Sequence, residues 1–202
     1  MTKQFTTIGY AYNELNEKAK EKVKEWYLND PIRSELFPES IKNDLECDFP
    51  NSDLDVIYSL CYCQGDGLNI VGKVNLYDFI DFWEASEKQK RRIEKYIDYA
   101  FQYYTFEQSN HYCYSCKFID KKYIDDAIDE FIEELKNQCF RNINTKDIKN
   151  FFNDLVDYFE ALDSEYEKSG YNYLYNVDED EIEESCLINE WYFDAVGNFL
   201  SC

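Results

Sequence analysis

Residues 54–76, LDVIYSLCYCQGDGLNIVGKVNL, consist of two alternating apolar segments separated by a short polar sequence. Alternation with a period of two is typical of β-strands that bury one face. The alternating side chains are Leu54, Val56, Tyr58, Leu60 and Tyr62 in the first segment and Leu68, Ile70, Val74 and Leu76 in the second. Between them, Gln64, Gly65, Asp66 and Gly67 include two glycines, which readily take the positive φ that a tight turn needs. The sequence therefore predicts a β-hairpin that turns at residues 64–67.

Apolar residues repeat at helical spacing on the N-terminal side of this hairpin. Asn13 is a plausible N-cap for a helix that Asp30 and Pro31 end, and a shorter helix can begin at Pro38. The apolar positions of these helices are Leu15, Ala19, Val23 and Trp26, and then Ile41 and Leu45. Two helices are therefore expected before the hairpin.

Three longer helices are expected after it. The capping box of Ser86 and Gln89 predicts a helix through Tyr104. Longer helices are expected over residues 121–139 and 146–168, and Thr145 and Gly170 would cap and end the second. Their apolar stripes are Ile124, Ile128, Phe131 and Leu135, and Ile148, Phe152, Leu155, Phe159 and Leu162.

The remaining segments are short. Residues 110–119 and 171–175 have strand-like patterns, and a capping box at Asp178 and Glu181 predicts a short acidic helix. The chain is expected to close with a small hairpin that turns at Gly197 and Asn198. The sequence contains no internal repeat and no Pro-rich or Ser-rich segment typical of a linker. We therefore expect an α+β fold, in which helices pack on a small and mostly antiparallel sheet, and a single globular domain over residues 1–202.

The net charge of the chain is −21, with 42 acidic and 21 basic residues. Such a chain repels nucleic acid and anionic membranes, so its natural partners are basic protein surfaces. Residues 120–190 hold 21 acidic and 7 basic residues, a balance of −14. No apolar segment approaches the length of a membrane span, and residues 1–10 lack the apolar core of a signal peptide. We expect a cytoplasmic protein with reduced cysteines.

Two groups of possible metal ligands occur. Cys61 and Cys63 lie in the first predicted strand, and His111, Cys113 and Cys116 lie in a later one. These residue types can form a tetrahedral zinc site, but alternation along a strand would send Cys113 and Cys116 to opposite faces. We expect buried thiols, no metal and no cofactor. A catalytic pair of Cys61 or Cys63 with His111 lacks a visible orienting residue, so no enzyme activity is expected.

The acidic residues of the two long helices lie away from the apolar stripes. Rows of carboxylates on a rigid helix can imitate the charge spacing of a nucleic acid and bind a basic groove, although a merely solvated face is the alternative explanation. The candidate partner-binding residues are Asp126, Asp129, Glu130, Glu133 and Glu134 on the first helix, and Asp154, Asp157, Asp163 and Glu165 on the second. Residues 64–67 are expected to have a structural role in the turn.

Three segments, NELNEKAKEKVKEWY at 13–27, IYSLCYCQGDGLNI at 57–70 and NEWYFDAVGNFL at 189–200, resemble a family of small phage and prophage proteins. The resemblance covers the N-terminal third and the last dozen residues, and the Gln-Gly-Asp-Gly turn is its most specific element. It implies a phage or mobile-element setting and supplies no catalytic residues. In that setting, a compact and acidic protein resembles an inhibitor of host defence, such as an anti-CRISPR or anti-restriction protein.

Two functions are therefore compared. The first is a non-enzymatic inhibitor in the host cytoplasm, which binds the basic groove of a nucleic-acid-guided or nucleic-acid-binding nuclease of the defence system. An antitoxin-like protein would differ from it only in its target. The second is a small-molecule or nucleotide-signal binding protein, or an enzyme, with a pocket beside residues 64–67. The acidic balance argues against a phosphate ligand for that pocket.

Overall fold

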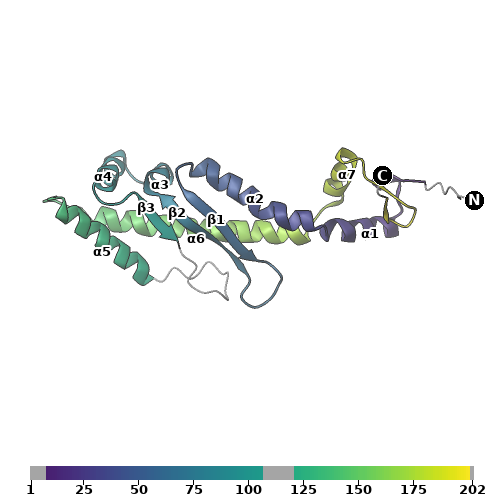
Figure 1. The fold of residues 1–202 in the computed structure, drawn as a ribbon, viewed down its shortest axis with the longest axis horizontal. Helices are drawn as coiled ribbons and strands as arrows, with labels where there is room; N and C mark the ends of the chain where they lie inside the picture. Colours follow the sequence, from purple (N-terminus) through teal and green to yellow (C-terminus); the bar gives the residue numbers. More distant parts are fainter. Residues whose placement is uncertain (1–7, 107–120, 201–202) are drawn as a thin grey trace, which may run out of the picture. The chain divides into compact units, whose positions relative to one another are not determined.

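The computed structural model describes residues 8–106 and 121–200 (Figure 1). In these ranges the chain forms α-helices, a three-stranded antiparallel sheet and a two-stranded ribbon, so the α+β prediction is confirmed. Its contacts divide it into two compact units, and each is described here by itself. Unit 1 comprises Met1–Phe37 and Gly170–Cys202, and unit 2 comprises Pro38–Ser169. The expectation of a single globular domain over residues 1–202 stays a prediction.

The sheet of unit 2 has the order β1-β2-β3, with β1 (Asp53–Ser59), β2 (Gly67–Asn75) and β3 (Tyr103–Phe106). Strands β1 and β2 pair with Val56 opposite Ile70, which confirms the predicted hairpin. The connection is longer than predicted, because β1 ends at Ser59 and residues 60–66 form the loop. Strand β3 begins at Tyr103, although a helix was expected to continue through Tyr104, and the strand expected at 110–119 lies outside the described residues.

Three helices of unit 2 were predicted with somewhat different ends, and a fourth was not predicted. Helix α3 (Leu76–Phe82) begins where the second strand was expected to end, because the Asn75 side chain caps it by accepting a hydrogen bond from the Tyr77 N–H. Helix α4 (Glu87–Ile97) opens with the predicted capping box of Ser86 and Gln89. Helix α5 covers Lys121–Asn137, and helix α6 (Thr145–Tyr175) begins in unit 2 and ends in unit 1. Among the described helices, none combines the length and the apolar character needed to cross a membrane.

Helix α2 (Pro31–Asp48) corrects the prediction of a short helix that starts at Pro38. Pro31 is its first residue, a position where the missing N–H leaves no hydrogen bond unmade. The helix continues through Pro38, so one proline starts it and the other lies inside it. Its residues from Pro38 onward belong to unit 2 and bury Ile41 and Leu45, as predicted.

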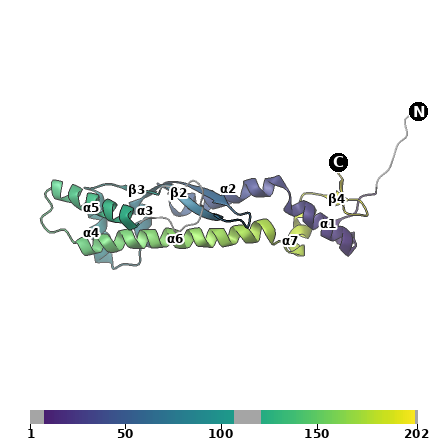
Figure 2. The ribbon, with the colours of Figure 1, turned by 90° about the horizontal axis from the view of Figure 1, so that it is seen from below.

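The core of unit 2 lies between α6 and the sheet, and Figures 1 and 2 show α6 running along one sheet face. The Phe159 ring of α6 lies 4.7 Å from the Phe106 ring of β3, and Phe152 lies 5.9 Å from Tyr104. Helix α5 joins this core through Phe131, whose ring is 5.3 Å from Phe152. The predicted apolar stripes of α5 and α6 are thus confirmed, except that Leu162 is only half-buried.

Unit 1 contains a 3₁₀ turn, η1 (Tyr12–Glu14), followed by α1 (Glu17–Leu28), the first turns of α2, the end of α6, and α7 (Glu179–Ile188). Asn16, and not Asn13, caps α1. Helix α6 continues through Gly170 to Tyr175, so the strand expected at 171–175 was wrong. The predicted cap of α7 is confirmed, because the Asp178 carboxylate accepts a hydrogen bond from the Glu181 N–H at 2.7 Å.

The predicted C-terminal hairpin forms the two-stranded ribbon of β4 (Tyr192–Phe193) and β5 (Phe199–Leu200). It turns at Gly197, whose φ of 84° suits glycine. A side chain there would also collide with α1, since a Cβ atom on Gly197 would lie 2.4 Å from the Ala19 carbonyl oxygen. The Trp26 ring of α1 stacks on Phe199 with 5.0 Å between ring centroids. The ribbon is therefore part of the core of unit 1.

Candidate protein-binding surface on helix α5

Helix α5 presents the five predicted carboxylates to solvent. Its apolar stripe is buried, with the Phe131 ring 5.0 Å from Phe101, and the acidic side chains occupy the opposite positions. All five are exposed; we call them the α5 acidic surface, and they are Asp126, Asp129, Glu130, Glu133 and Glu134. Residues three and four positions apart are neighbours on a helix, so these carboxylates form one continuous surface.

The charge density of this surface is close to that of one nucleic-acid strand. From Asp126 to Glu134 the helix rises about 12 Å, so its five charges are spaced about 3 Å apart along the axis. One strand of B-DNA carries a charge about every 3.4 Å. The α5 acidic surface can therefore compete for a row of Lys and Arg side chains that neutralises phosphates.

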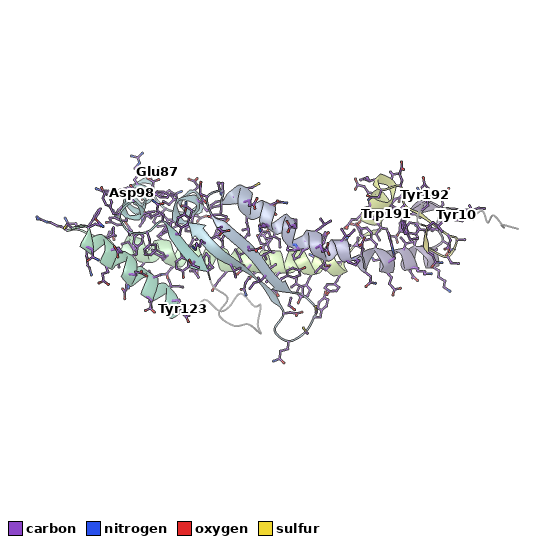
Figure 3. All side chains as sticks on the ribbon, viewed as in Figure 1. Tyr10, Glu87, Asp98, Tyr123, Trp191 and Tyr192 are labelled. Carbon is purple, nitrogen blue, oxygen red and sulfur yellow. The ribbon has the colours of Figure 1, made fainter. Side chains whose placement is uncertain are left out.

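None of these five carboxylates is neutralised within the described residues. The ion pairs in that part of the chain lie elsewhere, as in the contact between Arg92 and the buried Asp147. Two neighbours extend the surface: Asp125 is also exposed and was not singled out from the sequence, and Tyr123 is 63% exposed. Figure 3 labels Tyr123 near the N-terminal end of α5, where it gives the surface an aromatic side chain.

Helix α6 contributes less than its sequence suggests. Asp154, Asp157 and Glu165 are exposed as expected. The Asp154 carboxylate, however, accepts a hydrogen bond at 2.7 Å from the indole N–H of Trp83, whose side chain is buried. The dense part of the acidic surface is therefore on α5.

Asp163 does not lie on an exposed face, and this expectation was wrong. Its side chain is 5% exposed, and its carboxylate accepts a hydrogen bond from the Ile70 N–H of β2 at 2.7 Å. Its pKa is raised to about 8. Burial is the largest cause, the hydrogen bond from Ile70 opposes the change, and the nearby Glu160 and Glu167 add to it. The sequence contained the signal, because Asp163 follows the buried Phe159 by four residues and so continues the apolar stripe.

The hairpin loop is organised around Asp66. Its carboxylate accepts hydrogen bonds from the Cys61 N–H at 2.6 Å, the Cys63 N–H at 2.9 Å and the Ser59 hydroxyl at 3.0 Å. Burial acts to raise the pKa of Asp66, but these bonds and one from the Cys63 thiol outweigh it and hold the pKa well below its usual range. Gly65 supplies the turn with a φ of 93°, and Gln64 is exposed. Two of the loop N–H groups that could bind an anion, those of Cys61 and Cys63, are thus taken by Asp66, which weakens the case for the alternative nucleotide-binding function.

Cys61 and Cys63 are exposed in this loop, which corrects the expectation that they are buried. The Cys63 thiol donates a hydrogen bond to Asp66 at 3.0 Å, and that bond is the main reason that its pKa is raised. A raised pKa lowers the fraction of reactive thiolate, which disfavours a nucleophilic role for Cys63. His111, Cys113 and Cys116 lie outside the described residues, and within those residues no three metal-binding side chains come together.

Two of the three segments for which a resemblance to phage and prophage proteins was expected meet in unit 1. Trp26, in the segment 13–27, lies 5.1 Å from Trp191 and 5.6 Å from Phe193, both in the segment 189–200. The aromatic residues of these two segments therefore pack together in the core of unit 1. Comparisons with protein-family models, curated proteins and solved structures gave no match.

Proposed function

We propose that this protein is a non-enzymatic inhibitor of a bacterial defence system, carried by a phage or mobile element and acting in the host cytoplasm. The α5 acidic surface binds a basic nucleic-acid-binding groove of the target, which is a nucleic-acid-guided or nucleic-acid-binding nuclease. The resemblance of the three segments suggests the setting. The observation that carries the binding mode is the row of five exposed carboxylates on α5 that no described basic residue neutralises.

The electrostatics favour a protein partner. With a net charge of −21, the protein attracts a basic groove over long range and repels the nucleic acid that would otherwise fill it. Exposed charges are screened beyond about 8 Å at physiological ionic strength, so association slows as salt rises. Tyr123 adds an aromatic contact beside the charges, and such contacts are less sensitive to salt.

The α5 acidic surface can be tested against a surface of equal charge. In the first variant Asp129, Glu130, Glu133 and Glu134 are replaced by Lys. In the control the same change is made at four exposed carboxylates of α2, which are Glu35, Glu39, Asp44 and Glu46. Both variants change the net charge by the same amount, and circular dichroism establishes that each is folded.

Tagged wild type and both variants are used for affinity capture from the same bacterial lysate at three salt concentrations. We expect the wild type and the α2 control to retain a common nuclease, the α5 variant to lose it, and the captured nuclease to lose binding to its nucleic acid. Retention by the α5 variant contradicts the proposed binding surface. Capture of a partner that binds no nucleic acid contradicts the proposed function.

A further inference from the structure

Unit 1 contains an open pocket bordered by exposed apolar side chains. The pocket is open at its mouth and has a volume of about 100 Å³. Tyr12, Leu187, Trp191 and Tyr192 line it, and they come from η1, α7 and the start of the ribbon. Leu187 is 77% exposed and Tyr192 is 44% exposed, so the fold leaves much of this apolar lining in contact with water. Figure 3 shows Trp191 and Tyr192 beside Tyr10, whose backbone pairs with Phe193.

The rim of the pocket is acidic and its floor is neutral. Glu183 and Glu190 are exposed at the rim, and none of the described residues that line the pocket is Lys or Arg. At the floor, burial raises the pKa of the Cys186 thiol to about 11 and that of the Tyr12 hydroxyl to about 12. The negative potential of the pocket therefore comes from its glutamates.

Glu190 has a backbone conformation that favours glycine. It follows the last turn of α7 with a φ of 53°, and the next N–H, that of Trp191, donates to the Cys186 carbonyl at 2.9 Å. This is the helix ending at which glycine is the usual residue, since a side chain in the left-handed region is strained. The glutamate is therefore unfavourable for folding at a position that lines the pocket.

We propose that this pocket binds a segment of a partner protein in which an apolar side chain is flanked by Lys or Arg. The apolar side chain contacts Leu187, Trp191 and Tyr192, and the cation lies against Glu183 and Glu190. Charge complementarity selects this occupant, because the described lining residues supply carboxylates without cations. The site goes beyond the proposed function, since it is formed by unit 1 and none of its residues belongs to α5.

Three peptides test this proposal by titration into isotope-labelled protein. The probe is acetyl-Gly-Arg-Leu-Arg-Leu-Gly-amide; in one control Ser replaces Leu, and in the other Glu replaces Arg. The signal is the indole N–H resonance of Trp191, which separates this pocket from simple attraction to the α5 acidic surface. We expect a saturable shift with the Arg-Leu peptide alone. An equal response to all three peptides, or no response to any, overturns the proposal.

The variant Glu190→Gly tests the role of the carboxylate in binding without a cost to folding. It removes the carboxylate, and glycine also relieves the strain of the positive φ at this position. We expect this variant and Glu190→Gln to bind the Arg-Leu peptide about three-fold more weakly, the size of one exposed charge contact. Glu184→Gln, on an exposed residue of α7 outside the pocket lining, is the matched control and should bind as the wild type does. Unchanged peptide binding by both Glu190 variants would show that the Glu190 carboxylate does not bind the cation, which overturns this part of the proposal.

Two further outcomes are informative. The variant with four Lys on α5 should bind the Arg-Leu peptide at the Trp191 pocket as the wild type does, so this inference survives even when the proposed function fails. If the Trp191 resonance instead shifts with protein concentration alone, a second copy of the chain covers the pocket and the proposed occupant is wrong.

Discussion

The carboxylate of Asp163 in helix α6 accepts a hydrogen bond from the backbone N–H of Ile70 in strand β2, with 2.7 Å between oxygen and nitrogen. The contact joins the long helix to the central strand of the three-stranded sheet. It also places an ionisable group in the core of unit 2, where its side chain is 5% exposed. The burial of this ionisable group links the stability of the unit to pH.

Replacing Asp163 by Asn should remove that pH dependence. The pKa of Asp163 is raised to about 8 in the fold from 3.8, so the native state holds a proton that the unfolded chain releases between these values. The contribution of the group to stability is thus present at low pH and is lost as pH rises from about 4 to about 8. Asn can accept the same hydrogen bond without charge, so the variant should exceed the wild type at pH 8 to 9 by on the order of a few kcal/mol.

Urea unfolding of the wild type and of Asp163→Asn between pH 5 and 9 measures the difference in their stability. The matched control is Asp157→Asn, on an exposed carboxylate of the same helix, which should leave the pH profile of the wild type unchanged. A constant difference between wild type and Asp163→Asn across this range would mean that Asp163 does not titrate there.

Replacing Asp66 by Ala should loosen the hairpin loop and make Cys63 more reactive. The thiol of Cys63 loses the hydrogen-bond acceptor that is the main reason for its raised pKa, so its thiolate fraction near pH 8 should increase. We expect alkylation of Cys63 by iodoacetamide, followed by peptide mass spectrometry, to become several-fold faster. Ser59→Ala, which removes one loop hydrogen bond and keeps the carboxylate, should leave the rate near that of the wild type. An unchanged rate in the Asp66 variant would show that Asp66 does not control this thiol.

Replacement of cysteine by serine should affect stability differently at the exposed and the buried positions. Cys61 and Cys63 are exposed, so replacing both should change stability by less than about 0.5 kcal/mol each. Cys186 is buried in the core of unit 1, and a serine hydroxyl there should cost about 1 to 3 kcal/mol. Chemical unfolding of the two variants provides the comparison. Equal losses in both would contradict the exposed position of the loop cysteines.

The two compact units should unfold together. Helices α2 and α6 both contribute residues to each unit, so neither unit keeps all of its helical contacts when the other unfolds. Trp83 reports on unit 2, whereas Trp26 and Trp191 report on unit 1. In variants that keep Trp83 alone or Trp191 alone, urea should produce fluorescence transitions with the same midpoint. Separate midpoints would replace the expected single domain by two.

Much of the secondary structure and the α5 acidic surface could be predicted because their signals are local. The alternation over residues 54–76 predicts the hairpin, and the caps at Ser86 and Asp178 mark the starts of α4 and α7. The exposure of the α5 carboxylates follows from the same periodicity that buries Phe131. In each case residues within a few positions of one another carry the information, so the sequence by itself determined these features.

Tertiary contacts decided the features that the sequence did not predict. Tyr104 lies in a strand because β2 pairs with it through Val74 and because Phe152 packs on its ring, and both partners are distant in sequence. Helix α6 continues past Gly170, where the local signal predicted an end. Asp163 is buried because β2 presents the Ile70 N–H to it. The pocket at Trp191 exists because the fold brings η1, α7 and the ribbon together, and a pattern read along one segment contains no information about such a meeting.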